Sequence, residues 1–269
     1  ILPQGAEFAG STPDLQTILF TSKDRLDPSD VDDCADVYRY RSGAISLIST
    51  AGEPSEAYDA RFDATSGDGS RALFSTREAL PQAAGESVDS DQAVDIYERV
   101  GSMTTRLSTG EGGGNAELGA VFRAASRDAN HVLFETREAL VRGDRDDAVD
   151  VYDHAGGITR LITNKRRGTH AAHLRAISED GRRVIFVSRD RLTASDHDDG
   201  WDLYLKRGAR TFLVSRGPDA GDPAVFQRAT TNASHVFFRT RGRLVATDRD
   251  NSYDVYDMTT SHLRLISTS

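Results

Sequence analysis

The amino-acid sequence repeats one unit five times. A short acidic segment that ends in tyrosine recurs as SDVDDCADVY, VDSDQAVDIY, GDRDDAVDVY, SDHDDGWDLY and TDRDNSYDVY. The first aspartates of the copies are Asp30, Asp89, Asp144, Asp196 and Asp248, so the steps between copies are 59, 55, 52 and 52 residues. Repeats of about 50 residues are typical of the four-stranded blades of a β-propeller. The period therefore favours a fold built from stacked copies of one small unit.

Each unit divides into four β segments separated by turn residues. In the fourth unit these segments are residues 173–178, 184–188, 202–206 and 211–215. The second segment reads ILF, ALF, VLF, VIF and VFF in successive units, and such a continuous apolar run is typical of a strand buried on both faces. A β-solenoid or a pair of packed sheets is the competing arrangement, but equal repeats favour radial closure, which also protects the sheet edges.

We therefore predict an all-β chain that forms a single five-bladed β-propeller of four-stranded antiparallel blades. The domain covers residues 1–269, with blades at approximately 6–50, 60–109, 120–163, 172–215 and 224–269. The ring would be larger if the natural chain continued beyond these ends.

The repeat resembles the TolB-like propellers that are built from WD40-like (PD40) repeats. The segment SEDGRRVIFVS followed by DLYLK is similar to the Asp-Gly turn, buried strand and Asp-Ile-Tyr strand of that family, and TPDLQTILFTS to DVYRY and SGDGSRALFST to DIYER repeat it. The loop between the second and third strands is longer here than in the family. The resemblance implies a propeller that serves as a binding platform, as an accessory domain or as the gate of a peptidase.

Composition limits the classes of partner. The net charge of −9 argues against a general grip on nucleic acid, which needs a basic surface, and no run approaches the roughly 18 apolar residues that span a bilayer. The single cysteine, Cys34, excludes a disulfide within the chain. We expect a monomer that binds neither nucleic acid nor a membrane. We also expect the protein to be secreted or to lie in the cell envelope, because the family that it resembles, named above, is commonly exported and because calcium sites are predicted below.

The acidic segments follow the pattern Asp-x-Asp-polar-x-x-Asp-[Val/Ile/Leu]-Tyr. Oxygen atoms spaced in this way within one short loop are typical of Ca²⁺ sites, although the pattern lacks the central glycine and the distal glutamate of an EF-hand. We predict one structural Ca²⁺ per loop and up to five in all, which would move the net charge from −9 to about +1. The predicted ligands are Asp30, Asp32 and Asp36; Asp89, Asp91 and Asp95; Asp144, Asp146 and Asp150; Asp196, Asp198 and Asp202; and Asp248, Asp250 and Asp254.

A metal-free turn is the alternative interpretation of the same pattern. Every second strand ends on a basic residue that could pair with the last aspartate of the loop, and aspartates also build turns through bonds to their own backbone. These basic residues are Lys23, Arg77, Arg137, Arg189 and Arg241. A salt bridge would explain the last aspartate of each loop but not the first two.

The blades differ from one another on their first strands. The aligned positions hold Ala9, Asp63, Arg123, Arg175 and Gln227, and Arg228 follows the last of these. Because the first strand lines the channel of a propeller, we predict that Asp63, Arg123, Arg175, Gln227 and Arg228 bind a protein or carbohydrate ligand. The three arginines favour an anionic one. The alternative is that these arginines bind no ligand and are simply solvated in a water-filled channel.

No catalytic signature stands out. The chain contains no Gly-x-Ser-x-Gly, no Gly-Lys-Ser/Thr phosphate loop and no His-Glu-x-x-His. The glycines of GEGGGN (110–115) indicate a flexible connector rather than a phosphate cradle, and His170 and His173 make a weak candidate for a transition-metal site. We therefore predict a non-catalytic binding module. The alternatives are a polysaccharide-active enzyme, either a glycoside hydrolase or a lyase that uses Asp63, and a metal-free scaffold for protein interaction.

Overall fold

The chain forms β-strands and turns throughout the part that the structure describes. The computed structural model describes residues 5–50, 58–80, 88–163, 169–217, 221–259 and 262–267. Within these ranges there are five four-stranded sheets and no helix, so no helix that could cross a membrane is found among them. The all-β prediction is confirmed.

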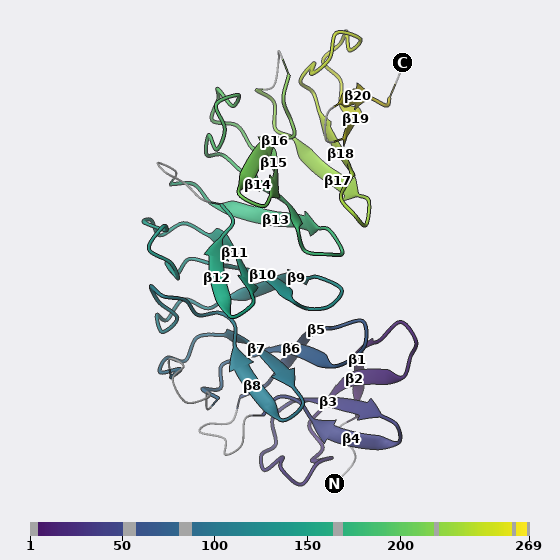
Figure 1. Cartoon of the computed structure of the whole chain (residues 1–269), viewed down its shortest axis with the longest axis vertical. Helices are drawn as coiled ribbons and strands as arrows, with labels where there is room; N and C mark the ends of the chain where they lie inside the picture. Colours follow the sequence, from purple (N-terminus) through teal and green to yellow (C-terminus); the bar gives the residue numbers. More distant parts are fainter. Residues whose placement is uncertain are drawn as a thin grey trace. The chain divides into compact units, whose positions relative to one another are not determined.

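The strands follow one another across each sheet in chain order, as β1-β2-β3-β4 does in the first sheet (Figure 1). Neighbouring strands pair antiparallel in the sheets of β1–β4, β5–β8, β13–β16 and β17–β20, and β9 pairs antiparallel with β10. The five sheets consist of β1 (Glu7–Ser11), β2 (Thr17–Ser22), β3 (Asp36–Arg41) and β4 (Ala44–Leu47); β5 (Arg61–Thr65), β6 (Arg71–Thr76), β7 (Asp95–Val100) and β8 (Met103–Arg106); β9 (Val121–Ala125), β10 (His131–Thr136), β11 (Asp150–Ala155) and β12 (Ile158–Leu161); β13 (Ala172–Ile177), β14 (Arg183–Ser188), β15 (Asp202–Arg207) and β16 (Arg210–Leu213); and β17 (Val225–Ala229), β18 (His235–Thr240), β19 (Asp254–Thr259) and β20 (Leu263–Leu265).

The expected strands of the fourth unit agree with β13 to β16 to within two residues at each end. The agreement has a simple cause. The second strand of each unit lies inside its sheet and carries the apolar run, so Leu73 on β6, Leu133 on β10 and Ile185 on β14 are completely buried. Apolar burial of this kind is worth about 25 cal/mol per Å² and fixes the strand in place.

The residues divide into two compact units, and each is described by itself. The first unit comprises Ile1–Arg142 with Asp153–Arg160, and the second comprises Gly143–Tyr152 with Leu161–Ser269. In the first unit, Leu19 and Val37 from one sheet share a hydrophobic core with Phe74 of the next. In the second unit, Ile185 and Leu203 share a core in the same way with Phe238. Neighbouring sheets thus bury apolar faces against each other, as blades do, while the single-domain boundary of 1–269 stays a prediction.

Candidate cation sites in the acidic loops

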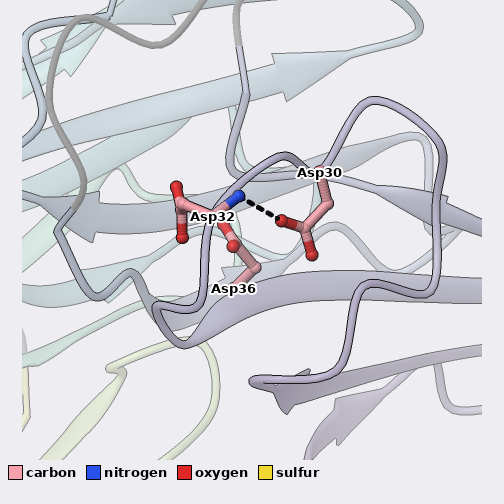
Figure 2. A group of neighbouring side chains, drawn as sticks. All are labelled: Asp30, Asp32 and Asp36. Atoms are coloured by element: carbon pink, nitrogen blue, oxygen red, sulfur yellow. Dashed lines mark hydrogen bonds between the residues drawn. The ribbon is translucent and has the colours of Figure 1, made fainter.

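The three aspartates of each acidic motif converge within their loop. The loop between β2 and β3 carries Asp30, Asp32 and Asp36, and Figure 2 shows their side chains close together. In every copy, one oxygen atom from each of the three carboxylates lies within 4.8 Å of the other two. The structure therefore brings together all fifteen aspartates that the sequence predicted as ligands, in five groups of three. We call each group a triad.

Backbone N–H groups orient the first two carboxylates. The N–H of Asp32 donates to Oδ1 of Asp30 at 3.3 Å, the bond drawn in Figure 2, and the N–H of Cys34 donates to Oδ1 of Asp32 at 2.6 Å. The four other loops repeat both bonds. Each triad is therefore held in a preformed turn, which explains why the first two aspartates stand two residues apart.

A buried tyrosine holds the first aspartate. The tyrosine that ends each motif is completely buried on the third strand, and its hydroxyl donates to Oδ2 of the first aspartate of the same loop, at 2.5 Å for Tyr97 and Asp89. The hydroxyls of Tyr38, Tyr97, Tyr204 and Tyr256 also contact a backbone carbonyl just after the second strand. The five tyrosines are Tyr38, Tyr97, Tyr152, Tyr204 and Tyr256. The motif's tyrosine thus links the acidic loop to the core of its sheet.

A hydroxyl beyond the fourth strand holds the third aspartate. Ser49 donates to Oδ1 of Asp36 at 2.6 Å, and Ser215 donates to Oδ1 of Asp202 at the same distance. The remaining partners are Ser108, Thr163 and Ser267. Sequence reasoning missed these five residues, although the signal was present, because every unit ends in a hydroxyl residue two positions after the final Leu or Arg of its last strand.

The basic residues of the metal-free interpretation have other partners in three loops. Lys23 lies 3.8 Å from the carboxylate of Asp59, the Nε–H of Arg189 donates to the carbonyl of Asp199, and Arg241 stacks on the ring of Tyr253. In these loops a hydroxyl, and not a basic residue at the end of the second strand, satisfies the last aspartate.

The triads of the first and fourth blades each contain a buried carboxylate whose pKa is raised. Burial, reinforced by the charges of neighbouring aspartates, raises the pKa of Asp36 and of Asp202 to about 7 even though Ser49 and Ser215 each donate a bond that lowers it. Three carboxylates at this separation favour either a proton or a cation among them. An all-oxygen donor set of this kind fits a hard divalent ion.

The five aligned positions on the first strands share a backbone feature. Ala9, Asp63, Arg123, Arg175 and Gln227 are each skipped in the pairing between the first and second strands, so each lies at a β-bulge. Bulges re-aim side chains and are frequent next to binding sites. The bulge is therefore common to all five sheets, and only the side chain that it presents differs from one sheet to the next.

Two of the predicted ligand-binding residues lie in the first unit. The carboxylate of Asp63 is fully enclosed, accepts a bond from Arg61 at 2.6 Å and another from the Ser75 hydroxyl, and has a pKa raised by burial. Arg123 pairs with Glu135 at 2.8 Å. Each of these contacts stays within one sheet.

The other three lie in the second unit. Arg175, Gln227 and Arg228 are exposed. The side chain of Arg175 donates to the carbonyl of Leu174, and that of Gln227 donates to the carbonyls of Val225 and Phe226. Arg175 at the bulge of β13 and Arg228 next to the bulge of β17 are therefore presented to solvent.

Two further sequence candidates find internal partners. The N–H groups of Gly114, Asn115 and Ala116 all donate to Oε1 of Glu138, at 2.5, 3.0 and 3.1 Å, so the chain's own carboxylate occupies the place that a phosphate would take. This contact also shows that the GEGGGN segment is tied to its neighbour rather than a free connector. His170 pairs with Asp190 at 2.9 Å, whereas the ring of His173 stacks on Trp201.

Comparisons with known proteins identify the fold. No family model matches the chain, and no curated protein matches it. Similar solved structures include one from a study of two prolyl endopeptidases, with a TM-score of 0.52 and 12% identity over 99% of this chain and 36% of that chain. An acylaminoacyl peptidase gives a TM-score of 0.43 at 13% identity over 98% of this chain and 39% of its own. The β-propeller domain of the trilobed protease from Pyrococcus furiosus gives 0.40 at 10% identity, over 98% of this chain and 84% of its own.

The chain spans only about a third of the length of the first of these chains, and at 12% identity the similarity establishes a fold and not an activity. Five antiparallel four-stranded sheets that pack face to face within each unit agree with it. The chain is an all-β protein of the β-propeller fold, with five four-stranded blades that each carry an aspartate triad.

Proposed function

We propose that this protein is a non-catalytic binding module whose blades are stabilised by Ca²⁺ ions in the acidic loops. One observation carries the proposal, namely the convergence of three carboxylates to within 4.8 Å of one another in every blade. Buried or half-buried carboxylates repel one another unless a cation lies among them. Because the same arrangement occurs in all five loops, it belongs to the repeated unit and is not confined to one part of the surface.

The chemistry of the donors favours calcium over other metals. Each triad supplies oxygen atoms only, which disfavours the metals that prefer thiolate or imidazole ligands. Ca²⁺ accepts six to eight oxygen ligands in flexible geometries, whereas Mg²⁺ demands a nearly ideal octahedron and keeps several waters. A loop that offers three carboxylates beside its own backbone carbonyls suits the larger ion.

The contacts of the triads indicate what the ion would do. The first aspartate is bonded to a core tyrosine and the third to a hydroxyl beyond the fourth strand. An ion bound to both would therefore connect the acidic loop to two elements of the same sheet. Binding to the folded state alone stabilises it by RT ln(1 + [L]/Kd), so the effect would grow with calcium concentration. Weak sites of this kind fill at the calcium levels outside cells, which supports an exported protein.

The decisive experiment is thermal unfolding of the chelated protein, repeated with added Ca²⁺ or Mg²⁺, together with elemental analysis of bound metal. We expect a rise in melting temperature that is larger for Ca²⁺ than for Mg²⁺, with several ions per chain. The variant Asp198→Asn should lose one ion, whereas Asp180→Asn, in an exposed turn outside the triads, should lose none. A chelated protein that neither binds metal nor shifts its melting temperature would make the triads metal-free turns.

For the ligand, we propose a carboxylated carbohydrate that binds at the first strands. The exposed guanidinium groups of Arg175 and Arg228 support this proposal, because arginine pairs with carboxylates through two parallel hydrogen bonds. A binding screen against acidic and neutral polysaccharides tests it. Arg175→Ala and Arg228→Ala should weaken capture of the acidic ones, while Arg182→Ala, an exposed arginine in a turn, should not.

The rival function is cleavage of a polysaccharide. The observation that favours it is the raised pKa of Asp63, since general acids in glycosidases show such a shift. Its carboxylate is, however, enclosed and bonded to Arg61 and Ser75. Bond cleavage that is lost on Asp63→Asn would establish the enzyme in place of the binding module.

A further inference from the structure

The second blade departs from the repeat at one buried position. The last strand of each blade holds a leucine two residues before the hydroxyl that binds the third aspartate, except on β8, where the residue is Arg106. The four leucines are Leu47, Leu161, Leu213 and Leu265. Arg106 is only 2% exposed, so a full positive charge is buried where the other blades place an apolar side chain.

The guanidinium of Arg106 reaches into the triad of its own blade. Its Nη1 lies 3.2 Å from Oδ1 of Asp89 and 3.3 Å from Oδ2 of Asp95. The same nitrogen donates to the carbonyl of Gly114 at 2.7 Å and to Oδ1 of Asn115 at 3.0 Å. Four oxygen atoms, two from carboxylates and two from amide groups, thus surround one cationic nitrogen. These are the ligand types that a calcium ion takes in a protein loop.

The segment that supplies the two amide oxygens is fixed in place. Glu138 accepts the N–H groups of residues 114–116 through one carboxylate oxygen. Gly114 has a φ of +134°, and a Cβ at this position would lie 2.6 Å from Oγ1 of Thr109. The glycine therefore allows the close turn that presents its carbonyl to Arg106. At the second triad the protein itself therefore supplies both the cationic group and the oxygen atoms around it.

In the first and fourth blades an arginine lies beside the triad without pairing with its carboxylates, and its Nε–H donates to the backbone carbonyl of Asp32 or Asp198. In the first blade Arg25 binds Asp33 at 3.0 Å, and in the fourth blade Arg191 binds Asp199 at 3.2 Å, and neither aspartate is a triad member. Among the described residues, no lysine, arginine or histidine forms an ion pair with the triads of the first, fourth and fifth blades. The buried guanidinium is therefore a feature of the second blade when it is compared with these three.

We propose that Arg106 is the resident cation of the second triad, so that the protein binds four calcium ions and not five. This inference rests on the proposed function, because it assumes that the other triads bind the ion. A divalent cation in the second triad would need oxygen atoms of Asp89 and Asp95, the two carboxylates that already face the guanidinium, and the two positive charges would repel each other. The second blade is then stabilised permanently, whereas the other four depend on calcium.

The experiment counts calcium ions by elemental analysis and by calorimetric titration of the chelated full chain. The wild-type protein should bind four ions. Arg106→Leu installs the residue found in the other blades and frees the triad, so this variant should bind five and should depend more strongly on calcium for its melting temperature. Five ions in the wild type, or four in the variant, would overturn the assignment of Arg106 and leave the proposed function intact.

A second pair of variants keeps the test valid if Arg106→Leu fails to fold. Asp91→Asn alters the second triad and should leave the count at four, whereas the matched change Asp198→Asn alters the fourth triad and should reduce the count to three. Loss of an ion from Asp91→Asn would show that calcium occupies the second triad and would overturn the inference. No bound calcium in any protein of the series would instead reject the proposed function on which the inference rests.

Discussion

The hydroxyl of Tyr204 donates a hydrogen bond to Oδ2 of Asp196, and both residues are buried between the acidic loop and the core of the fourth sheet. The oxygen of the same hydroxyl lies 2.8 Å from the carbonyl of Asp190, while the ring stacks on Phe186 at 5.5 Å between centroids. One side chain thus joins the apolar core to the first aspartate of the triad. The other four blades repeat the bond to the aspartate.

We expect Tyr204→Phe to lower the free energy of unfolding by about 1–3 kcal/mol, since it keeps the stacked ring but leaves a buried carboxylate without its donor. Chemical denaturation at a fixed calcium concentration measures the change. Tyr253→Phe is the control, because Tyr253 is 52% exposed. Equal effects of the two substitutions would contradict the role assigned to the buried hydroxyl.

Stability should depend on pH in a direction set by the triads. Without a cation, the pKa of Asp36 and of Asp202 is about 7 in the folded protein, against an ordinary value of 3.8. The folded state therefore holds more protons than the unfolded state between these values, so stability should fall as pH rises from about 4 to about 7 and then level off. Denaturation in chelator across this range tests the sign. Asp36→Asn and Asp202→Asn should each flatten the fall, and a rise in stability over the same range would contradict the shifts.

A strained turn offers a stabilising substitution. Leu15 has a φ of +58° and a side chain that is 68% exposed, whereas the equivalent positions in the second and fourth blades hold Gly69 and Gly181 at +70°. A left-handed conformation costs an L-residue about 1–2 kcal/mol, which exceeds the entropic cost of glycine. Leu15→Gly should therefore raise the free energy of unfolding by about 0.5–1 kcal/mol. Gly69→Ala is the converse test and should destabilise the protein, because its Cβ would also lie 2.6 Å from Oγ1 of Thr17.

The segment around Gly114 should be intolerant of a side chain. Gly114→Ala would place its Cβ against Thr109 and move the carbonyl away from Arg106, so we expect a loss of about 1–3 kcal/mol. Gly43→Ala provides the comparison, since Gly43 also has a positive φ of +85° but has no atom within 4 Å of the added Cβ. Thermal unfolding of both variants separates crowding from backbone strain. A smaller effect at Gly114 than at Gly43 would contradict this account of the turn.

The sequence alone determined the blades and the members of the triads. Strand boundaries were predictable because they depend on local periodicity and on turn residues. The aspartate groups were predictable because they depend on spacing within one loop. Each of these signals occurs in all five units. The salt-bridge alternative also used only residues of one loop, the last aspartate and the basic residue at the end of the second strand. It did not account for Ser215, which lies 13 residues from Asp202 in the chain and reaches it only because β15 and β16 pair.

Only the tertiary structure decided which triad differs from the rest. Arg106 is visible in the sequence as a substitution for leucine, but its meaning depends on contacts with Asp89, Asp95 and Gly114, which come from three separate segments. The same holds for Glu138, whose carboxylate fills the turn around Gly114 from 24 residues away. A sequence repeat determines the contacts between residues that are close along the chain, such as the strands and the turn of one acidic loop. A charge buried between segments acquires its partners only when the sheets are packed, because the energy of an ion pair depends on distance and on exclusion of water.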